Sequence, residues 1–295
     1  MRVRALFLAV AFFLPLTGSA QAAQKNAPPP AILEIGVLPY LNMESLLRTY
    51  GPLAVFLEKE TGKTTRIVSA RDYPHLLQLT ASKAYSLLVT ASHFARLAQQ
   101  DSGYIPLLIP LTTYHELILV KSDSPLAGLA DLKGKNIAIP DPLAQTSIMG
   151  RAQLRWHGLD PDKDVTLSVA GSHTNAMLGL QNGSYDAAVV SEGGYNHMDE
   201  AAKQNVRILP VAQGFGKARP EAIPVAYVAS PELPVKEREK LTTLISRFAN
   251  DTAEGKAWIN GLGYKGLRPP KPEEMAAQDI YVTELRRIMA ASIKR

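Results

Sequence analysis

Short apolar runs alternate with amphipathic stretches along most of the chain, which is the pattern of parallel α/β units. In the first half the pattern predicts strands at residues 32–38, 64–69, 86–90 and 105–110, separated by helices at 44–61, 74–82 and 92–100. After residue 123 it predicts strands at 136–140, 165–169, 186–190 and 206–209, separated by helices at 146–157, 174–182 and 194–204. Two similar α/β halves therefore follow each other without a detectable sequence repeat.

Two further extended segments, residues 116–121 and 223–229, lie where one half gives way to the other. We interpret them as two crossing strands that form a hinge. The expected fold is α/β with two lobes, each a mainly parallel sheet flanked by helices. The expected division is a signal peptide at 1–22, lobe 1 at 31–118, lobe 2 at 122–222, and a second part of lobe 1 with C-terminal helices at 227–295.

The C-terminal region predicts helices at residues 235–252 and 272–293. The second helix carries apolar residues at near-helical spacing: Met275, Ile280, Leu285, Ile288 and Met289. Such an apolar stripe usually packs on the protein's own core, so we expect this helix to pack on lobe 1 rather than to bind a partner.

The N-terminus has the parts of a secretory signal peptide. Arg2 and Arg4 precede an apolar run at residues 5–16, and Ala-Gln-Ala at 20–22 is a typical cleavage site. A membrane anchor is the alternative, but a spanning helix needs about 20 apolar residues, and Pro15 interrupts this run. The sequence therefore predicts an exported protein, and without a lipid anchor a Gram-negative periplasm is its expected location.

Composition narrows the classes of function. The 295 residues are 46% hydrophobic and 20% charged and include no cysteine, which is typical of a globular protein and excludes disulfides, thiolate metal sites and a lipoprotein anchor. Removing residues 1–22 takes away two arginines and no acid, so the formal charge falls from +5 to +3. Nothing here suggests nucleic acid, and the chain lacks the G-x-S-x-G, H-E-x-x-H, G-x-G-x-x-G and C-x-x-C motifs. No cofactor or metal is expected, and an enzyme is not supported.

Polar residues cluster where predicted strands give way to helices. In parallel α/β folds, ligands bind beyond the carboxyl ends of strands, where helix N-termini present free N–H groups. The candidate ligand-binding residues at these junctions are Tyr40, Thr90, Ser92, Gln145, Thr146, Ser147, Ser172 and His173. Each Ser or Thr can equally be a helix N-cap, worth about 1 kcal/mol to its own helix. Thr146 and Ser147 together favour an anion site.

Several segments resemble the phosphate, phosphite and phosphonate-binding periplasmic proteins of ABC importers, a branch of the type 2 periplasmic binding-protein fold. The matching segments are Asp72-Tyr73 with 76–78, and residues 114–125, 129–135, 141–142, 170–176 and 182–188. The resemblance covers most of residues 32–270. It implies that Tyr73 and Tyr114 are cleft aromatics and that His173 contacts the oxyanion, with Ser172 as the neighbouring choice of register.

The loop after Asp-Pro departs from the family pattern. That loop usually reads S-T-S-G and holds the phosphonate, whereas residues 143–148 here read Leu-Ala-Gln-Thr-Ser-Ile. An aminoalkyl phosphonate would also need carboxylates around its ammonium group. Glu192 is one candidate, but Val225 and Ala226 stand where the family places an aspartate. A small oxyanion without an amine therefore fits at least as well.

The resulting interpretation is a monomeric solute-binding protein that closes two lobes over a small anionic ligand and delivers it to an inner-membrane ABC permease. An alternative is a sensory role, in which the closed form docks on a membrane sensor kinase. A periplasmic hydrolase using Glu192 or His173 as acid or base is disfavoured, because no nucleophile or metal set accompanies them.

Overall fold

The computed structural model describes residues 32–196, 198–211 and 221–293. The predicted signal peptide at residues 1–22 lies outside these ranges. Within the described ranges, none of the helices combines the length and the apolar character needed to cross a membrane.

The first sheet holds six strands in the order β11-β4-β10-β3-β1-β2. Their bounds are β1 Ile32–Val37, β2 Thr64–Ser69, β3 Leu87–Thr90, β4 Ile105–Pro110, β10 Ala226–Ala229 and β11 Leu267–Arg268. Strand β1 pairs in parallel with β2 and β3, whereas β10 lies antiparallel between β3 and β4. Lobe 1 is therefore completed by a strand that follows β4 by more than one hundred residues of chain.

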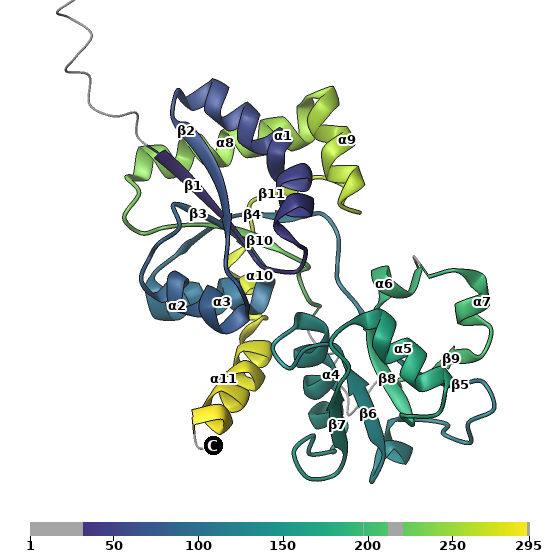
Figure 1. Cartoon of the computed structure of the whole chain (residues 1–295). Helices are drawn as coiled ribbons and strands as arrows, with labels where there is room; N and C mark the ends of the chain where they lie inside the picture. The colour runs from purple at the N-terminus through teal and green to yellow at the C-terminus, as the bar shows by residue number, and fades with distance from the viewer. Residues whose placement is uncertain (1–31, 197, 212–220, 294–295) are drawn as a thin grey trace, which may run out of the picture.

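Helices cover both faces of this sheet, and each face has its own apolar cluster (Figure 1). The helices are α1 Met43–Thr61, α2 Tyr73–Ala81, α3 Ser92–Ser102, α8 Val235–Asp251, α9 Ala253–Gly261, α10 Pro272–Ala276 and α11 Asp279–Ile293. Side chains alternate along β10: Tyr227 and Ala229 join the cluster with α1 and α8, while Ala226 and Val228 join the cluster with α3 and α11.

The second sheet holds five strands in the order β7-β6-β8-β5-β9. Its elements are β5 Glu116–Lys121, η1 Leu129–Leu132, β6 Asn136–Ile139, α4 Gln145–Trp156, β7 Thr166–Val169, α5 His173–Gln181, β8 Ala187–Ser191, α6 Glu192–Asn196, α7 Glu200–Lys203 and β9 Val206–Ile208. Strand β6 pairs in parallel with β7 and β8, whereas β5 is antiparallel to β8 and β9. The first sheet thus contains two reversed strands, β10 and β11, and the second sheet contains one, β5.

The two strands expected to cross as a hinge exist, but they do not pair with each other. Strand β5 belongs to the second sheet and β10 to the first. The two connecting segments meet instead at one antiparallel bridge between Tyr114 and Ala222. By sheet membership, lobe 2 therefore begins at Glu116 and not at residue 122.

The C-terminal helix α11 packs on α3, as expected for lobe 1, and also on α4 of lobe 2 (Figure 1). Ile148, Met149 and Ala152 of α4 share an apolar cluster with Tyr281 and Leu285 of α11. An apolar interface therefore joins the lobes in addition to the two chain connections.

Two predicted helices differ from the structure. The segment expected as a helix at 194–204 forms α6 and α7, and α6 already begins at Glu192, directly after β8. The expected helix at 272–293 is divided into α10 and α11 at residues 277–278, where the buried Gln278 side chain donates to the carbonyls of Glu221 and Glu274. Helix α9 and strand β11 were not expected.

Candidate functional site

A cavity of about 350 Å³ lies between the two lobes. Lobe 2 contributes Ala144, Gln145, Thr146, His173 and Ser191. Lobe 1 and the returning segment contribute Leu38, Tyr40, Tyr50, Tyr73, Ala91, Phe94, Pro224, Val225, Leu262 and Tyr264, and Tyr114 of the connecting segment completes the lining. The cavity is therefore built at strand ends and helix starts of both lobes, as the junction pattern predicts.

Helices α3 and α4 both begin at this cavity, and both have alanine at the N-cap. Ala91 and Ala144 line the cavity, and neither helix has a side-chain cap. Helices α1, α2 and α5, by contrast, begin with Asn42, Asp72 and Ser172, whose side chains accept from the backbone. An alanine cap costs about 1 kcal/mol relative to a polar cap. It also leaves the first N–H groups of the helix available to an anion.

Thr146 lies in the first turn of α4 and connects to the wall of the cavity. Its hydroxyl is 2.7 Å from the Tyr114 hydroxyl. Burial raises the pKa of Tyr114, although its hydrogen bonds with Thr146 and Ser191 oppose that rise. The phenol therefore stays protonated at neutral pH and forms a hydroxyl pair with Thr146 beside the helix N-terminus.

His173 is the first residue of α5, and its ring lines the cavity. The Ser191 backbone N–H donates to its Nδ1 at 3.4 Å, so the proton of the neutral ring resides on Nε2. Burial lowers the pKa of His173. The ring is therefore a neutral donor at pH 7 when no anion is present.

Ser191 ends β8 and was not among the predicted residues. Its hydroxyl accepts from the Gly194 N–H at 3.0 Å. A Cβ at Gly194 would lie 2.8 Å from that hydroxyl oxygen, so a larger residue would displace Ser191. Ser191 lies at the end of a predicted strand, directly before Glu192, and this position could have identified it as a candidate ligand-binding residue from the sequence.

Tyrosine rings form much of the lobe 1 wall. The Tyr40 and Tyr50 hydroxyls are 3.4 Å apart. Burial raises the pKa of Tyr73 to about 12 and also raises the pKa of Tyr40 and of Tyr264. These hydroxyls therefore remain uncharged donors and do not repel an anion. Tyr40 and Tyr73 were predicted, whereas Tyr50, Phe94 and Tyr264 were missed because nothing local in the sequence places them together.

Gln145 lines the cavity, but its amide is already engaged. Its Nε2 donates to the Ser92 hydroxyl at 3.1 Å and to the Ile223 carbonyl at 2.7 Å. Ser92 donates in turn to Gln278 at 3.0 Å. The side chains of Gln145 and Ser92 therefore connect α4, α3 and the start of α11. Because these side chains are engaged, the groups that the two residues can offer a ligand are their backbone N–H groups.

Five predicted residues do not line the cavity: Ser92, described above, and Thr90, Ser147, Ser172 and Glu192. Thr90 and Ser147 are fully buried, and neither hydroxyl has a hydrogen-bond partner among the described residues. Ser172 caps α5 by accepting from the Asn175 N–H at 3.0 Å. Glu192 is exposed. Their side chains are therefore placed for structural or surface roles in this conformation.

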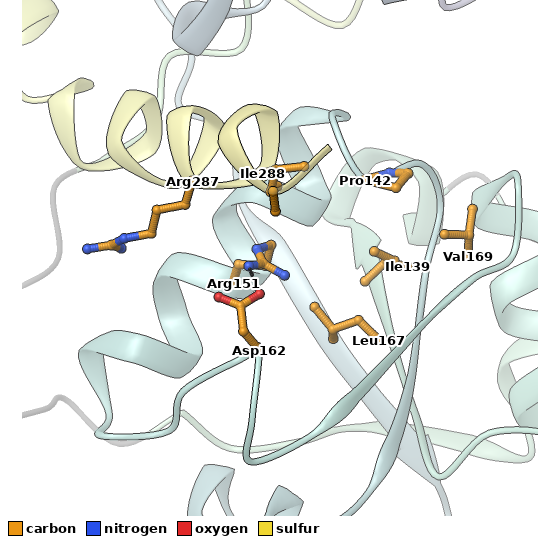
Figure 2. A pocket seen from close by; sticks show the side chains of 9 residues that line it. Ile139, Pro142, Arg151, Asp162, Leu167, Val169, Arg287 and Ile288 are labelled. Atoms are coloured by element: carbon orange, nitrogen blue, oxygen red, sulfur yellow. Dashed lines mark hydrogen bonds and ion pairs between the residues drawn. The ribbon is translucent and has the colours of Figure 1, made fainter. Parts of the chain in front are cut away.

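A second cavity, of about 290 Å³, lies between α11 and lobe 2 (Figure 2). Arg151 and Asp162 face each other there as an ion pair, and Ile139, Leu167 and Ile288 add apolar surface. Because Arg151 is also paired with Glu284, its charge is already balanced. Within the described residues, no group of three or more metal-ligating side chains is found.

Two α/β lobes, a cavity between them and helix N-termini at that cavity are the architecture expected of a solute-binding protein. The sequence profile described as "ABC transporter, phosphonate, periplasmic substrate-binding protein" matches residues 35–275. The chain belongs to this family, which consists of substrate-binding transport proteins and not of enzymes.

Similar proteins agree with this membership. The "Phosphate-import protein PhnD" of Mycolicibacterium smegmatis is 25% identical over 180 residues, and the match spans 54% of each chain, so the chain covers about half the length of that relative. XAC2383 from Xanthomonas citri, solved with chloride, has a TM-score of 0.71 at 17% identity and covers 88% of this chain and 99% of its own. PhnD1 from Prochlorococcus marinus, solved with methylphosphonate, also has a TM-score of 0.71 at 15% identity, and the match covers 87% of this chain and 99% of PhnD1. These two structures show that the fold is shared.

Proposed function

We propose that this chain binds a phosphonate-class oxyanion between its lobes and delivers it to an inner-membrane ABC permease. One observation carries the ligand class: the alanine-capped N-termini of α3 and α4 meet at a cavity that also holds the Tyr114–Thr146 hydroxyl pair and His173. The helix N-termini contribute N–H donors and a positive electrostatic potential, and the hydroxyls and the imidazole contribute further donors, which is what a compact oxyanion needs. The methylphosphonate bound to PhnD1 supports the same class.

We also propose that residues 1–22 are cleaved on export, and that the mature protein is a monomer of the Gram-negative periplasm without a lipid anchor. The cationic start, the short apolar run and the Ala-Gln-Ala site support cleavage. Intact-mass measurement on protein isolated from its own cells checks the cleavage, because cleavage after Ala22 gives a product that begins at Ala23.

Calorimetric titration with methylphosphonate and with inorganic phosphate tests the ligand class. We expect saturable binding of at least one of them at one site per chain. Absence of binding by these two anions, and also by phenylphosphonate and 2-aminoethylphosphonate, would overturn the oxyanion assignment.

The variant Thr146→Val tests the site itself. It keeps the shape of the side chain, removes one hydroxyl and removes the Thr146 hydrogen bond of Tyr114, so binding should weaken by about 1 to 3 kcal/mol. Ser147→Ala is the matched control, because the Ser147 hydroxyl does not line the cavity and its backbone N–H is retained. Equal affinities for Thr146→Val and wild type would place the anion away from the α4 N-terminus.

A further inference from the structure

The two lobes contribute different kinds of surface to the interlobe cavity. Lobe 2 supplies the Thr146 and Ser191 hydroxyls and the His173 imidazole. Lobe 1 supplies mainly rings and aliphatic groups, among them Leu38, Tyr40, Phe94 and Leu262. An oxyanion held at the N-termini of α3 and α4 therefore leaves the rest of its molecule against a wall that is largely apolar.

Tyr73 and Phe94 form an aromatic part of that wall. Their ring centroids are 5.4 Å apart at an interplanar angle of 38°. His93 lies against the same Phe94, with ring centroids 4.0 Å apart. His93 is itself held by a 3.0 Å hydrogen bond from its Nε2 to the Leu143 carbonyl. Phe94 is thus fixed in place before a ligand arrives, which reduces the cost of ordering on binding.

Charged side chains are absent from the described lining of this cavity. The predicted carboxylate, Glu192, is exposed and outside the lining. Asp141 acts on Tyr73 electrostatically, but it too lies outside the lining, and its carboxylate accepts from the Leu143 N–H at 2.8 Å. An ammonium group enclosed here would lose its hydration without gaining a dedicated counter-charge, which is unfavourable.

The volume also exceeds what a bare inorganic anion fills. Cavities of about 300 to 1,000 Å³ are those that hold organic small molecules, and this one measures about 350 Å³. Lining by rings on one side and donors on the other is the pattern of a site for an amphipathic ligand.

We propose that the ligand is an organic oxyanion of the phosphonate class whose substituent is uncharged and apolar, with an aromatic ring as the best fit to the Tyr73–Phe94 wall. This inference rests on the proposed function, because it takes the oxyanion to lie at the α3 and α4 N-termini.

Calorimetry with four probes tests it: phosphate, methylphosphonate, phenylphosphonate and 2-aminoethylphosphonate. Phenylphosphonate should bind at least about tenfold more tightly than methylphosphonate, because its ring is removed from water. 2-Aminoethylphosphonate should bind at least about tenfold more weakly than phenylphosphonate, because its ammonium group stays unpaired.

The outcomes separate the two proposals. Failure of all four probes to bind overturns the proposed function. If methylphosphonate or phosphate binds but phenylphosphonate does not, the proposal of an apolar substituent is overturned and the oxyanion function stands. The same holds if 2-aminoethylphosphonate binds most tightly of the four.

Variants at Tyr73 identify the wall. Tyr73→Leu should weaken phenylphosphonate by about 2- to 10-fold more than it weakens methylphosphonate, since one ring contact is lost. Tyr73→Phe is the matched control that keeps the ring, and it should keep the wild-type ratio of the two affinities even where loss of the hydroxyl lowers both. An equal loss for both phosphonates in Tyr73→Leu, or the same change of this ratio in both variants, would contradict stacking on this ring.

Discussion

His93 is fully buried at the start of α3 and bridges the lobes by its hydrogen bond to the Leu143 carbonyl. Burial lowers the pKa of His93 to about 4, while the hydrogen bond to Leu143 opposes that shift. The usual value of about 6.5 applies to the unfolded chain. Between these values the unfolded chain binds the proton and the native protein does not, so the free energy of unfolding falls as the pH is lowered.

We therefore expect His93 to make the protein acid-sensitive. Between pH 7 and pH 5 the wild type should lose about 2 kcal/mol of unfolding free energy more than His93→Gln, at about 1.4 kcal/mol for each pH unit below 6.5. Urea unfolding at the two pH values measures this difference. The exposed His115, changed to Gln, is the control and should keep the wild-type slope. Parallel slopes for wild type and His93→Gln would contradict a neutral buried ring.

His173 should make ligand affinity depend on pH. Burial lowers its pKa in the free protein, and a bound anion must raise it again by linkage. The ratio of wild-type to His173→Gln affinity should therefore be constant above the bound-state pKa, rise as the pH falls through it, and level off below the free-state pKa. Calorimetry with methylphosphonate measures this ratio, in which the ligand's own ionisation cancels. A ratio independent of pH would remove the imidazole from anion binding.

Residue roles were only partly predictable from the sequence. The expectation that ligand-binding residues lie where strands give way to helices identified Thr146 and His173, which line the cavity. It could do so because a strand end and the following helix start are adjacent in the chain. It gave no information on the Ser92 and Gln145 side chains, because their partners depend on the three-dimensional packing. Gln278, which binds Ser92, is 186 residues away from it. Tyr264 was missed for the same reason.

At the scale of elements, the contact between α4 and α11 depends on Glu284. This carboxylate is buried and ion-paired with Arg155 at 2.6 Å, with Arg151 at 3.6 Å and with Arg287. Arg151 and Arg155 also pair with Asp162. Arg151 and Arg155 belong to lobe 2, whereas Glu284 and Arg287 belong to the C-terminal helix, so the pairs of Glu284 with Arg151 and Arg155 hold the two parts in one register.

Replacing Glu284 should be costly. Glu284→Gln leaves Arg151 and Arg155 without their buried counter-charge, and breaking such a pair costs about 3 to 5 kcal/mol. Chemical denaturation checks this value. Glu239→Gln, an exposed glutamate of α8, is the control and should change stability by less than about 0.5 kcal/mol. A similar small effect in both variants would show that Asp160 and Asp162 are sufficient counter-charges for the two arginines.

Elements with a local signal were predicted well, and those that depend on distant contacts were not. The alternation of apolar runs with amphipathic stretches predicted β1 to β4 and β6 to β9, because the apolar residues of each run themselves indicate a buried strand. The sequence of residues 226–229 does not indicate that this segment pairs between β3 and β4 in the first sheet. The sequence of α11 does not indicate that this helix contacts α4 as well as α3. The short strand β11, of two residues, has no periodicity to detect.

At the scale of the whole molecule, the cavity between lobes predicts closure around the ligand. Among the described residues, the segments that connect the lobes meet at the Tyr114–Ala222 bridge. Small-angle scattering should give a smaller radius of gyration with saturating ligand than without it. Identical scattering profiles under saturation would contradict the hinge.

The position of β10 also sets an order of assembly. Strands β3 and β4 do not pair with each other but with β10, which lies more than one hundred residues further along the chain. The second sheet, by contrast, is made from the continuous segment between Glu116 and Ile208. As the chain emerges from its N-terminus, the sheet begun first is thus the last to be completed, because such distant pairing must await the closing of a long loop. The surface that receives the ligand, which needs both sheets, forms only after the C-terminal quarter of the chain has emerged.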